Sequence, residues 1–179
     1  LSGGRMRIRK GQSRVCMVYE FIKYFPPAGQ RMKIMVSAVV GHVFGLDFDG
    51  KYHDPEQLYA ANTVKTIEDT TRKLRIVEHL QDLASESDYM ALWLDCDREG
   101  ENICFEVMKC MQHKMKKFSG SKQQIFRAKF SAVTEKDIRT AMSNLGSPNK
   151  HESDAVEARQ EMDLKVGVAF TRFQTKYFQ

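Results

Sequence analysis

The sequence predicts an α/β fold in which a mostly parallel sheet lies between helices. Residues 89–94 are apolar without alternation, which is typical of a strand buried on both faces. The acidic turn 95–101 follows at once, and apolar residues recur at helical spacing from Gly100. A second strand is predicted at 124–130, and a strand, helix, strand unit implies a right-handed crossover and a parallel pair. The acidic turn is therefore expected at the carboxyl end of a central strand, the usual ligand edge of such sheets.

The amino-terminal part is predicted to be a loop followed by a hairpin. Residues 1–13 are rich in Gly and Arg and have no apolar period, which indicates a loop. Residues 15–25 are rich in β-branched and aromatic side chains, and 31–40 alternate between apolar and polar. The segment PPAG at 26–29 is a turn signal between them. These two stretches are therefore expected to pair as a hairpin.

Between the hairpin and the central strand we expect a bend, a surface connection and a helix. Gly41 permits a tight bend that places His42 at a strand end, although a lone His is most often structural or solvent-facing. Residues 44–61 are expected to be an irregular surface connection. Residues 66–85 carry apolar side chains at helical spacing and predict an amphipathic helix that serves packing.

Another helix is predicted beyond the second strand. Residues 118–121 break the chain, and Thr134 begins the helix with Asp137 at the capping-box position. The amino end of a helix offers N–H groups to a phosphate, and Ser131, Thr134 and Arg139 would complete such a site. The alternative is that Thr134 only caps the helix. We expect His42 to converge on the same place.

The final helix is predicted to run from about Glu152 past Phe170. Arg159 and Asp163 lie four residues apart and share one face. They either form a partly sheltered ion pair, or Arg159 turns to a phosphate while Asp163 holds it. The side of this helix predicted to be packed carries Val156, Met162, Val166, Ala169 and Phe170.

The acidic turn carries the clearest chemical signal in the chain. In an extended segment Asp95 and Asp97 point to the same side, roughly 6.5 to 7 Å apart along the chain. Mg²⁺ prefers a small number of hard oxygen ligands, with coordination positions left open for phosphate oxygens. Glu99 can add a third carboxylate. The alternative is that these acids cap a helix and complement its dipole.

Composition excludes several other classes of protein. The sequence has 28 Lys and Arg against 23 Asp and Glu, a net charge of +5 that suits a polyanion partner. Its four cysteines show no C-x-x-C spacing, so zinc is not expected, and Cys104 and Cys110 are predicted to be core residues. No apolar stretch approaches the length of a membrane span, and no signal-peptide core is present, so no membrane association is predicted.

Several separated motifs carry a resemblance to a known family. Residues 94–103, LDCDREGENI, resemble the acidic motif of the Toprim domain of type IA DNA topoisomerases. The chain most resembles eukaryotic topoisomerase III, and it is closer to the beta than the alpha form at 93–107 and 171–179. The other matching segments, in the same order along the chain, are 41–43, 126–131 and 154–164.

The resemblance implies a fold and a domain division. It implies a Toprim-like domain at 1–150 that lacks its first strand and helix, with 151–179 as the start of the topoisomerase core domain. A C-terminal helix would lead to that next domain. The family has a Glu-Lys-Pro-Ser type motif and a nucleophilic Tyr, neither of which has a match here. The chain is therefore expected to be a fragment of the enzyme, inactive by itself.

The resemblance also implies a mechanism and a site. Family members cleave one strand through a 5′-phosphotyrosine link, pass another strand and reseal with Mg²⁺. Asp95, Asp97 and Glu99 would hold the ion, and Arg159 and Asp163 would belong to the cleavage site. The residues expected against the nucleic-acid strand are His42, Phe130, Ser131, Thr134 and Arg139.

The expected partners are single-stranded DNA, with RNA as a second class, and the remaining domains of the enzyme. The resemblance adds a Tudor-domain or OB-fold accessory protein, and localisation in the nucleus with the cytoplasm as a second compartment. One rival function is a non-catalytic module that binds single-stranded nucleic acid. Another is a D-x-D phosphotransferase, which would want Thr or Val soon after the second Asp, whereas residues 98–101 read REGE.

Overall fold

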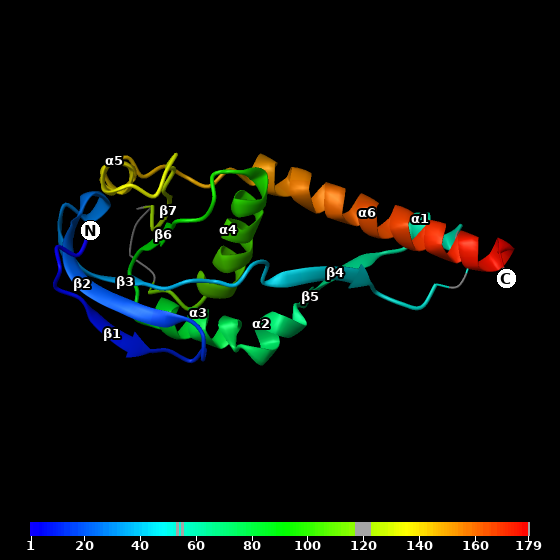
Figure 1. Ribbon diagram of the computed structural model, residues 1–179, viewed down its shortest axis with the longest axis horizontal. Coiled ribbons are helices and arrows are strands. Elements are labelled where there is room, and N and C mark those ends of the chain that lie inside the picture. The colour runs from blue at the N-terminus through cyan, green and yellow to red at the C-terminus, as the bar shows by residue number, and fades with distance from the viewer. Residues whose placement is uncertain (53, 55, 117–122, 179) are drawn as a thin grey trace.

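The protein is elongated, with its two termini at opposite ends (Figure 1). The computed structural model describes residues 1–52, 54, 56–116 and 123–178. The longest helix, α6 (Lys150–Tyr177), extends away from the body of the molecule. Beside it lie β4 (Phe44–Phe48), the short helix α1 (Gln57–Ala60) and β5 (Thr63–Ile67). The body contains the remaining strands and helices.

A parallel strand pair forms the centre of the body, as the sequence predicts. The pair consists of β6 (Met90–Leu92) and β7 (Ile125–Arg127), and α4 (Arg98–Met111) lies between them in the chain. Met90 and Leu92 are buried, because this strand lies against helices. The predicted break at 118–121 falls outside the described residues.

The predicted hairpin is confirmed. Its strands are β2 (Met17–Phe25) and β3 (Gln30–Val36), which pair antiparallel. The turn is a single 3-10 turn, Pro26–Ala28, closed by Gly29 at φ +67°. This left-handed conformation explains why a glycine ends the PPAG segment.

The structure corrects the predicted loop at 1–13. Residues of β1 (Arg7–Lys10) pair antiparallel with β2. Arg9 donates to Glu20 at 2.7 Å across this pair. A strand with no apolar period forms here because tertiary pairing supplies its hydrogen bonds.

Two further predictions of local structure were wrong in detail. The segment 44–61 is not irregular throughout, because it holds β4 and α1. Of the helix predicted at 66–85, the first two residues end β5, and the rest forms two helices, α2 (Asp69–Lys73) and α3 (Ile76–Ser85). Arg75, at φ +54°, separates them in the left-handed conformation that an α-helix cannot continue through.

The packed side predicted for α6 is only partly correct. Val156 and Ala169 are buried, whereas Met162, Val166 and Phe170 are 64%, 56% and 60% exposed. The outer part of α6 extends past the body, so the described residues cover only one side of it (Figure 1).

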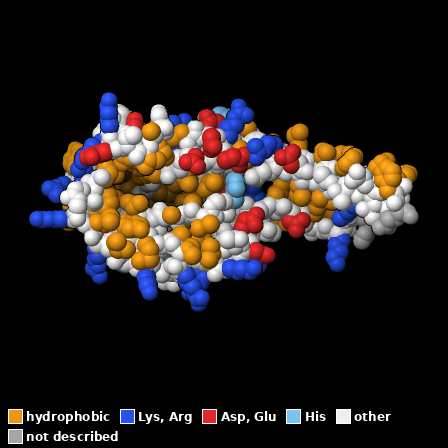
Figure 2. Space-filling model, viewed as in Figure 1, with side chains coloured by type: hydrophobic (Ala, Val, Ile, Leu, Met, Phe, Trp, Pro, Cys, Tyr) orange, Lys and Arg blue, Asp and Glu red, His pale blue; other side chains and the backbone are white. Residues whose placement is uncertain are grey.

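The α/β Toprim-like fold class is confirmed, but fewer strands pair in parallel than predicted. Among the described strands only β6 and β7 pair in parallel, while β1–β2–β3 and β4–β5 are antiparallel. An apolar cavity of about 800 Å³ separates β3 from β6, and Leu83 and Val107 line it. Figure 2 shows this hollow, edged by hydrophobic side chains.

The main core joins α3, α4 and β6 beneath the β2–β3 hairpin. Val18, Ile76, Leu92 and Cys104 are at most 4% exposed, and burial of each large apolar side chain contributes roughly 1.5–3 kcal/mol. Cys104 and Cys110 lie in this core, as predicted. α5 (Glu135–Ser143) contributes Met142 to a second cluster with Phe25 and Phe126. Among the described helices, none combines the length and hydropathy that a membrane span requires.

Candidate active site at the acidic turn

The acidic turn connects the end of β6 to the start of α4. Asp97 is the N-cap of α4, and its Oδ1 accepts a hydrogen bond from the Gly100 N–H at 2.7 Å. The capping alternative is therefore correct for one oxygen of Asp97. Gly100 is required here, because a Cβ at this position would lie 2.0 Å from the carbonyl oxygen of Asp95.

Arg127 holds the carboxyl end of β6 in place. Its side chain is fully buried, and its guanidinium donates to the carbonyl oxygens of Leu94 at 2.8 Å and Asp95 at 2.6 Å. It also donates to the carbonyl of Ala128 at 2.9 Å. These bonds fix the backbone that carries Asp95, so Arg127 positions the acidic turn from the buried side.

Glu101 balances the charge of Arg127. It is 1% exposed and accepts from the Arg127 Nε at 3.0 Å, while its other oxygen accepts from the Asn149 N–H at 3.2 Å. Asn149 is the N-cap of α6. The next residue of α4, Asn102, donates to the Ser153 carbonyl at 3.2 Å. Together these contacts fix the start of α6 against the acidic turn.

Sequence reasoning did not identify the pairing of Glu101 with Arg127. In an alternating strand Arg127 lies on the side opposite Phe126 and Ala128, so the pattern alone favours an exposed Arg127. The available signal was the position of Glu101, which lies on the same helical face as the apolar stripe of α4. A carboxylate on a buried face requires a buried cation nearby.

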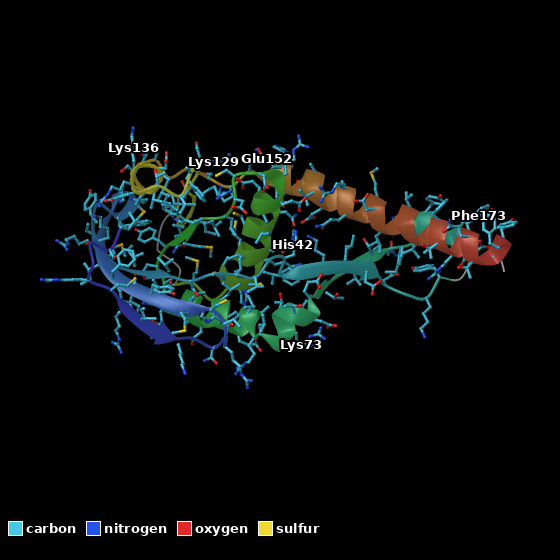
Figure 3. All side chains as sticks on the ribbon, viewed as in Figure 1. His42, Lys73, Lys129, Lys136, Glu152 and Phe173 are labelled. Carbon is cyan, nitrogen blue, oxygen red and sulfur yellow. The ribbon has the colours of Figure 1, made fainter. Side chains whose placement is uncertain are left out.

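Glu99 joins three elements at the edge of the site. It forms an ion pair with Arg159 of α6, and its other oxygen lies 3.3 Å from the Nε2 of His42. His42 stands in the connection between β3 and β4, and Figure 3 shows it near the junction of α4 and α6. The structure therefore brings together three predicted site residues, although His42 precedes Glu99 by 57 positions and Arg159 follows it by 60.

The predicted pair of Arg159 and Asp163 is present but weak. Arg159 Nε lies 3.8 Å from Asp163 Oδ2, and the two side chains are 58% and 75% exposed. An exposed i,i+4 pair contributes roughly 0.3–0.5 kcal/mol. Asp163 is a loose partner here, and Glu99 is the carboxylate that Arg159 contacts closely.

The start of α5 forms a separate group of predicted residues. Thr134 is the N-cap of α5, and its hydroxyl accepts from the Asp137 N–H at 3.1 Å, as the capping box predicts. Arg139 donates twice to Glu135, at 2.9 and 2.7 Å, which lowers the pKa of that carboxyl. Ser131 is exposed.

Phe130 and Trp93 form a stacked pair beside this group. Their ring centroids are 6.1 Å apart at an interplanar angle of 24°. The Phe130 N–H donates to the Sγ of Cys96, so Phe130 also borders the acidic turn. The expected convergence of His42 on the start of α5 is not met: Figure 3 places His42 far along the molecule from Lys136, which marks α5.

The acids of the turn fit Mg²⁺ in a particular way. In the described part of the chain, no three His, Cys, Asp or Glu side chains are grouped closely enough to enclose a metal. Asp95 is exposed and Asp97 has one oxygen outside its cap bond, whereas Glu99 already has His42 and Arg159 as partners. Mg²⁺ keeps several waters and needs only one or two carboxylates beside a phosphate. Asp95 and Asp97 therefore fit the ion better than Glu99 does.

Comparison with known proteins identifies the family. Residues 11–133 match the family model described as Toprim domain. The whole chain is 50% identical to the DNA topoisomerase 3-beta of Arabidopsis thaliana and 46% identical to the human DNA topoisomerase 3-beta-1. It is 38% identical to the human DNA topoisomerase 3-alpha, which agrees with the predicted closeness to the beta form.

The chain spans about a fifth of the length of these relatives: 20% of the Arabidopsis protein, 21% of the human beta protein and 18% of the human alpha protein. The Toprim match lies inside the predicted domain 1–150 and covers more than half of the chain. The parallel strand pair, the acidic turn and the sequence match agree, and this protein belongs to the Toprim domain family.

Proposed function

We propose that residues 1–179 are part of a type IA DNA topoisomerase of the topoisomerase III beta kind, which is an isomerase. The carrying observation is the acidic turn at the end of a parallel strand, where Glu99 joins His42 and Arg159. The whole protein cleaves one strand through a 5′-phosphotyrosine link, passes another and reseals it. Similarity to relatives named DNA topoisomerase 3-beta supports this proposal.

In this proposal the residues of the turn hold and orient the reacting phosphate. Asp95 and Asp97 hold Mg²⁺, which when bound offsets the negative charge on the transferring phosphate. Glu99 keeps Arg159 at the edge of the site, and Asp163 limits the movement of Arg159 from the next turn. The buried Arg127 fixes the position of the carboxylates by donating a hydrogen bond to the Asp95 carbonyl oxygen.

The nucleic-acid strand approaches two areas. His42 lies at the acidic turn, whereas Phe130, Ser131, Thr134 and Arg139 lie toward α5. Phe130 connects the two areas, because its ring stacks on Trp93 and its N–H donates to the Sγ of Cys96 in the acidic turn. A nucleic-acid strand that runs from the acidic turn past Phe130 to α5 would place phosphates near both areas.

The decisive experiment is relaxation of negatively supercoiled plasmid by the full-length protein. We expect Mg²⁺-dependent relaxation, and loss of resealing when Asp95→Asn and Asp97→Asn are combined. The control is Asp69→Asn, which removes an exposed acid from the first turn of α2. Full activity in the double variant would leave the acidic turn as a helix cap and favour the non-catalytic binding module.

Nucleic-acid contact at α5 has its own test. Arg139→Ala should weaken binding of single-stranded DNA and reduce the dependence of affinity on salt, because phosphate contacts release counterions. Arg72→Ala is the matched control, since Arg72 is also a helical, exposed arginine paired with an acid in its own helix. Equal affinities for the two variants would move the binding site elsewhere.

The partners and compartment follow from the same proposal. We expect single-stranded DNA as the substrate, RNA as a second substrate class, and the other domains of the enzyme as neighbours. A Tudor-domain or OB-fold accessory protein is proposed as a partner, and the nucleus as the main compartment beside the cytoplasm. Residues 1–179 alone should neither relax plasmid nor form a covalent DNA adduct, because both reactions require the nucleophilic Tyr.

A further inference from the structure

Glu106 is a buried carboxylate to which the proposed chemistry assigns no role. It lies on α4 and is 3% exposed. Its Oε2 accepts from the Val43 N–H at 2.7 Å, and its Oε1 lies 3.3 Å from the Nδ1 of His42. Burial of a carboxylate is costly unless it is hydrogen-bonded, so these two contacts are the reason it is tolerated.

The same contacts determine how His42 is held. The His42 carbonyl accepts from the Thr71 hydroxyl at 3.2 Å, and the next N–H, of Val43, is bound by Glu106. Gly41, at φ +64°, turns the chain immediately before it. The backbone is thus fixed on both sides of His42, and Glu106 additionally contacts one edge of its ring.

We propose that Glu106 is a positioning residue for His42. Glu106 binds the Nδ1 edge of the ring and thereby directs the Nε2 edge toward Glu99 and the acidic turn. The imidazole is 31% exposed in its side chain, so without this contact only the more exposed Glu99 would oppose its rotation about the side-chain bonds. The importance of the Nε2 direction for nucleic acid rests on the proposed function.

The position of the proton on a neutral His42 ring follows from burial. Both carboxylates lie 3.3 Å from a ring nitrogen and compete for the single N–H. Glu106 is 3% exposed in its side chain and Glu99 is 36% exposed, so water can satisfy Glu99 but not Glu106. An unsatisfied buried acceptor costs more, and the proton is therefore expected on Nδ1.

Glu106→Gln should move that proton. The amide of Gln has one accepting oxygen and one donating nitrogen. The Val43 N–H needs the oxygen, because its bond of 2.7 Å is the shorter of the two. The amide nitrogen would then face Nδ1 as a donor, so Nδ1 must accept and the ring proton must sit on Nε2.

Nitrogen NMR of protein carrying ¹⁵N-labelled histidine measures this directly, at a pH where the ring is neutral. The His42 signals are assigned with His42→Gln, and unchanged signals of His79, His113 and His151 show that Glu106→Gln remains folded. A shift from the Nδ1–H to the Nε2–H tautomer supports the proposal. The same tautomer in both proteins overturns it, because a purely structural carboxylate would not set the ring.

A double-mutant cycle in the full-length protein tests the consequence for nucleic acid. Glu106→Gln should weaken binding of a single-stranded oligonucleotide on the order of fivefold, the size of one net hydrogen bond, and less than about twofold when His42→Gln is already present. Glu20→Gln, a shielded carboxylate in the hairpin, should be additive with His42→Gln. An additive cycle for Glu106 overturns its action through His42.

The tautomer measurement and the binding measurement together distinguish the positioning role of Glu106 from the nucleic-acid contact of His42. If His42→Gln leaves oligonucleotide affinity unchanged while the tautomer still moves, the nucleic-acid contact of the proposed function fails and the positioning of the ring by Glu106 stands. If affinity falls with His42→Gln and the tautomer is unchanged by Glu106→Gln, the positioning role fails and the nucleic-acid contact stands.

Discussion

The same substitution, Gly to Ala, should have opposite effects at two helical positions. Gly100 lies in the first turn of α4, where an added Cβ would stand 2.0 Å from the carbonyl oxygen of Asp95. Gly167 lies inside α6 with nothing within 4 Å of the same atom. The pair therefore separates helix propensity from steric conflict at the acidic turn.

The expected free energies follow from these surroundings. Gly167→Ala should stabilise the protein by about 0.5–1 kcal/mol, because Gly loses more backbone entropy in a helix than Ala does. In Gly100→Ala the carbonyl of Asp95 must move by at least 1.0 Å to reach the 3.0 Å that real Cβ contacts respect, 3.0 minus 2.0. Overpacking of this kind costs about 1–3 kcal/mol.

Movement of that carbonyl has a second cost. The Asp95 oxygen accepts from the buried Arg127 at 2.6 Å, and loss of a hydrogen bond to a charged group costs about 1.5–3 kcal/mol. Since the two costs add, we expect Gly100→Ala to destabilise the protein by at least about 3 kcal/mol. At about 2–4 °C per kcal/mol in a chain of this size, Tm should fall by roughly 6–12 °C.

Urea unfolding followed by fluorescence measures both variants. Trp93 is the only Trp in the sequence and lies just before the acidic turn, so it reports on this region. Gly100→Ala should lower the urea midpoint and Gly167→Ala should raise it slightly. If Gly100→Ala is as stable as the unsubstituted protein or more stable, α4 does not approach the Asp95 backbone closely and a glycine is not required at this position of the acidic turn.

Three further predictions concern buried groups. Arg127→Leu should destabilise the protein by about 3–5 kcal/mol in urea unfolding because it removes the close, buried cation at 3.0 Å from Glu101 and leaves only the exposed Lys129 at 3.9 Å, and a milder loss would mean that Lys129 or water compensates Glu101. Burial raises the pKa of the Cys104 thiol to about 12, so iodoacetamide at pH 8 should alkylate the exposed Cys96 and spare Cys104 until the protein unfolds, as peptide mass spectrometry would show. Burial lowers the pKa of His79 below its ordinary 6.5, so the unfolded chain binds more protons and stability should fall as pH drops from about 6.5. His79→Gln should remove that slope from unfolding curves measured between pH 5 and 7, and an unchanged slope would assign it to another group.

Local patterns were sufficient where neighbours in sequence decide the structure. The uninterrupted apolar run 89–94 predicted the central strand, and the capping box at Thr134 predicted the start of α5. The PPAG turn predicted the hairpin. Each of these depends on periodicity or turn chemistry within a few residues, which a sequence displays directly.

Other features depend on partners distant in the chain. Arg7–Lys10 became a strand because β2 supplied hydrogen bonds, and the helix predicted over 66–85 is interrupted at Arg75. The exposed outer side of α6 could not be predicted, because its apolar spacing does not say whether another element covers it. Pairing and coverage are tertiary properties.

The candidate site divides in the same way. The sequence by itself determined that Asp95, Asp97 and Glu99 follow a buried strand, and that Arg159 and Asp163 share a helix face. Only the tertiary structure decided that Glu99 meets both Arg159 and His42, and that His42 lies away from α5. The reason is physical: local spacing orients side chains within one element, whereas the buried bonds of Arg127, Glu101 and Glu106 join different elements and place their side chains at one site.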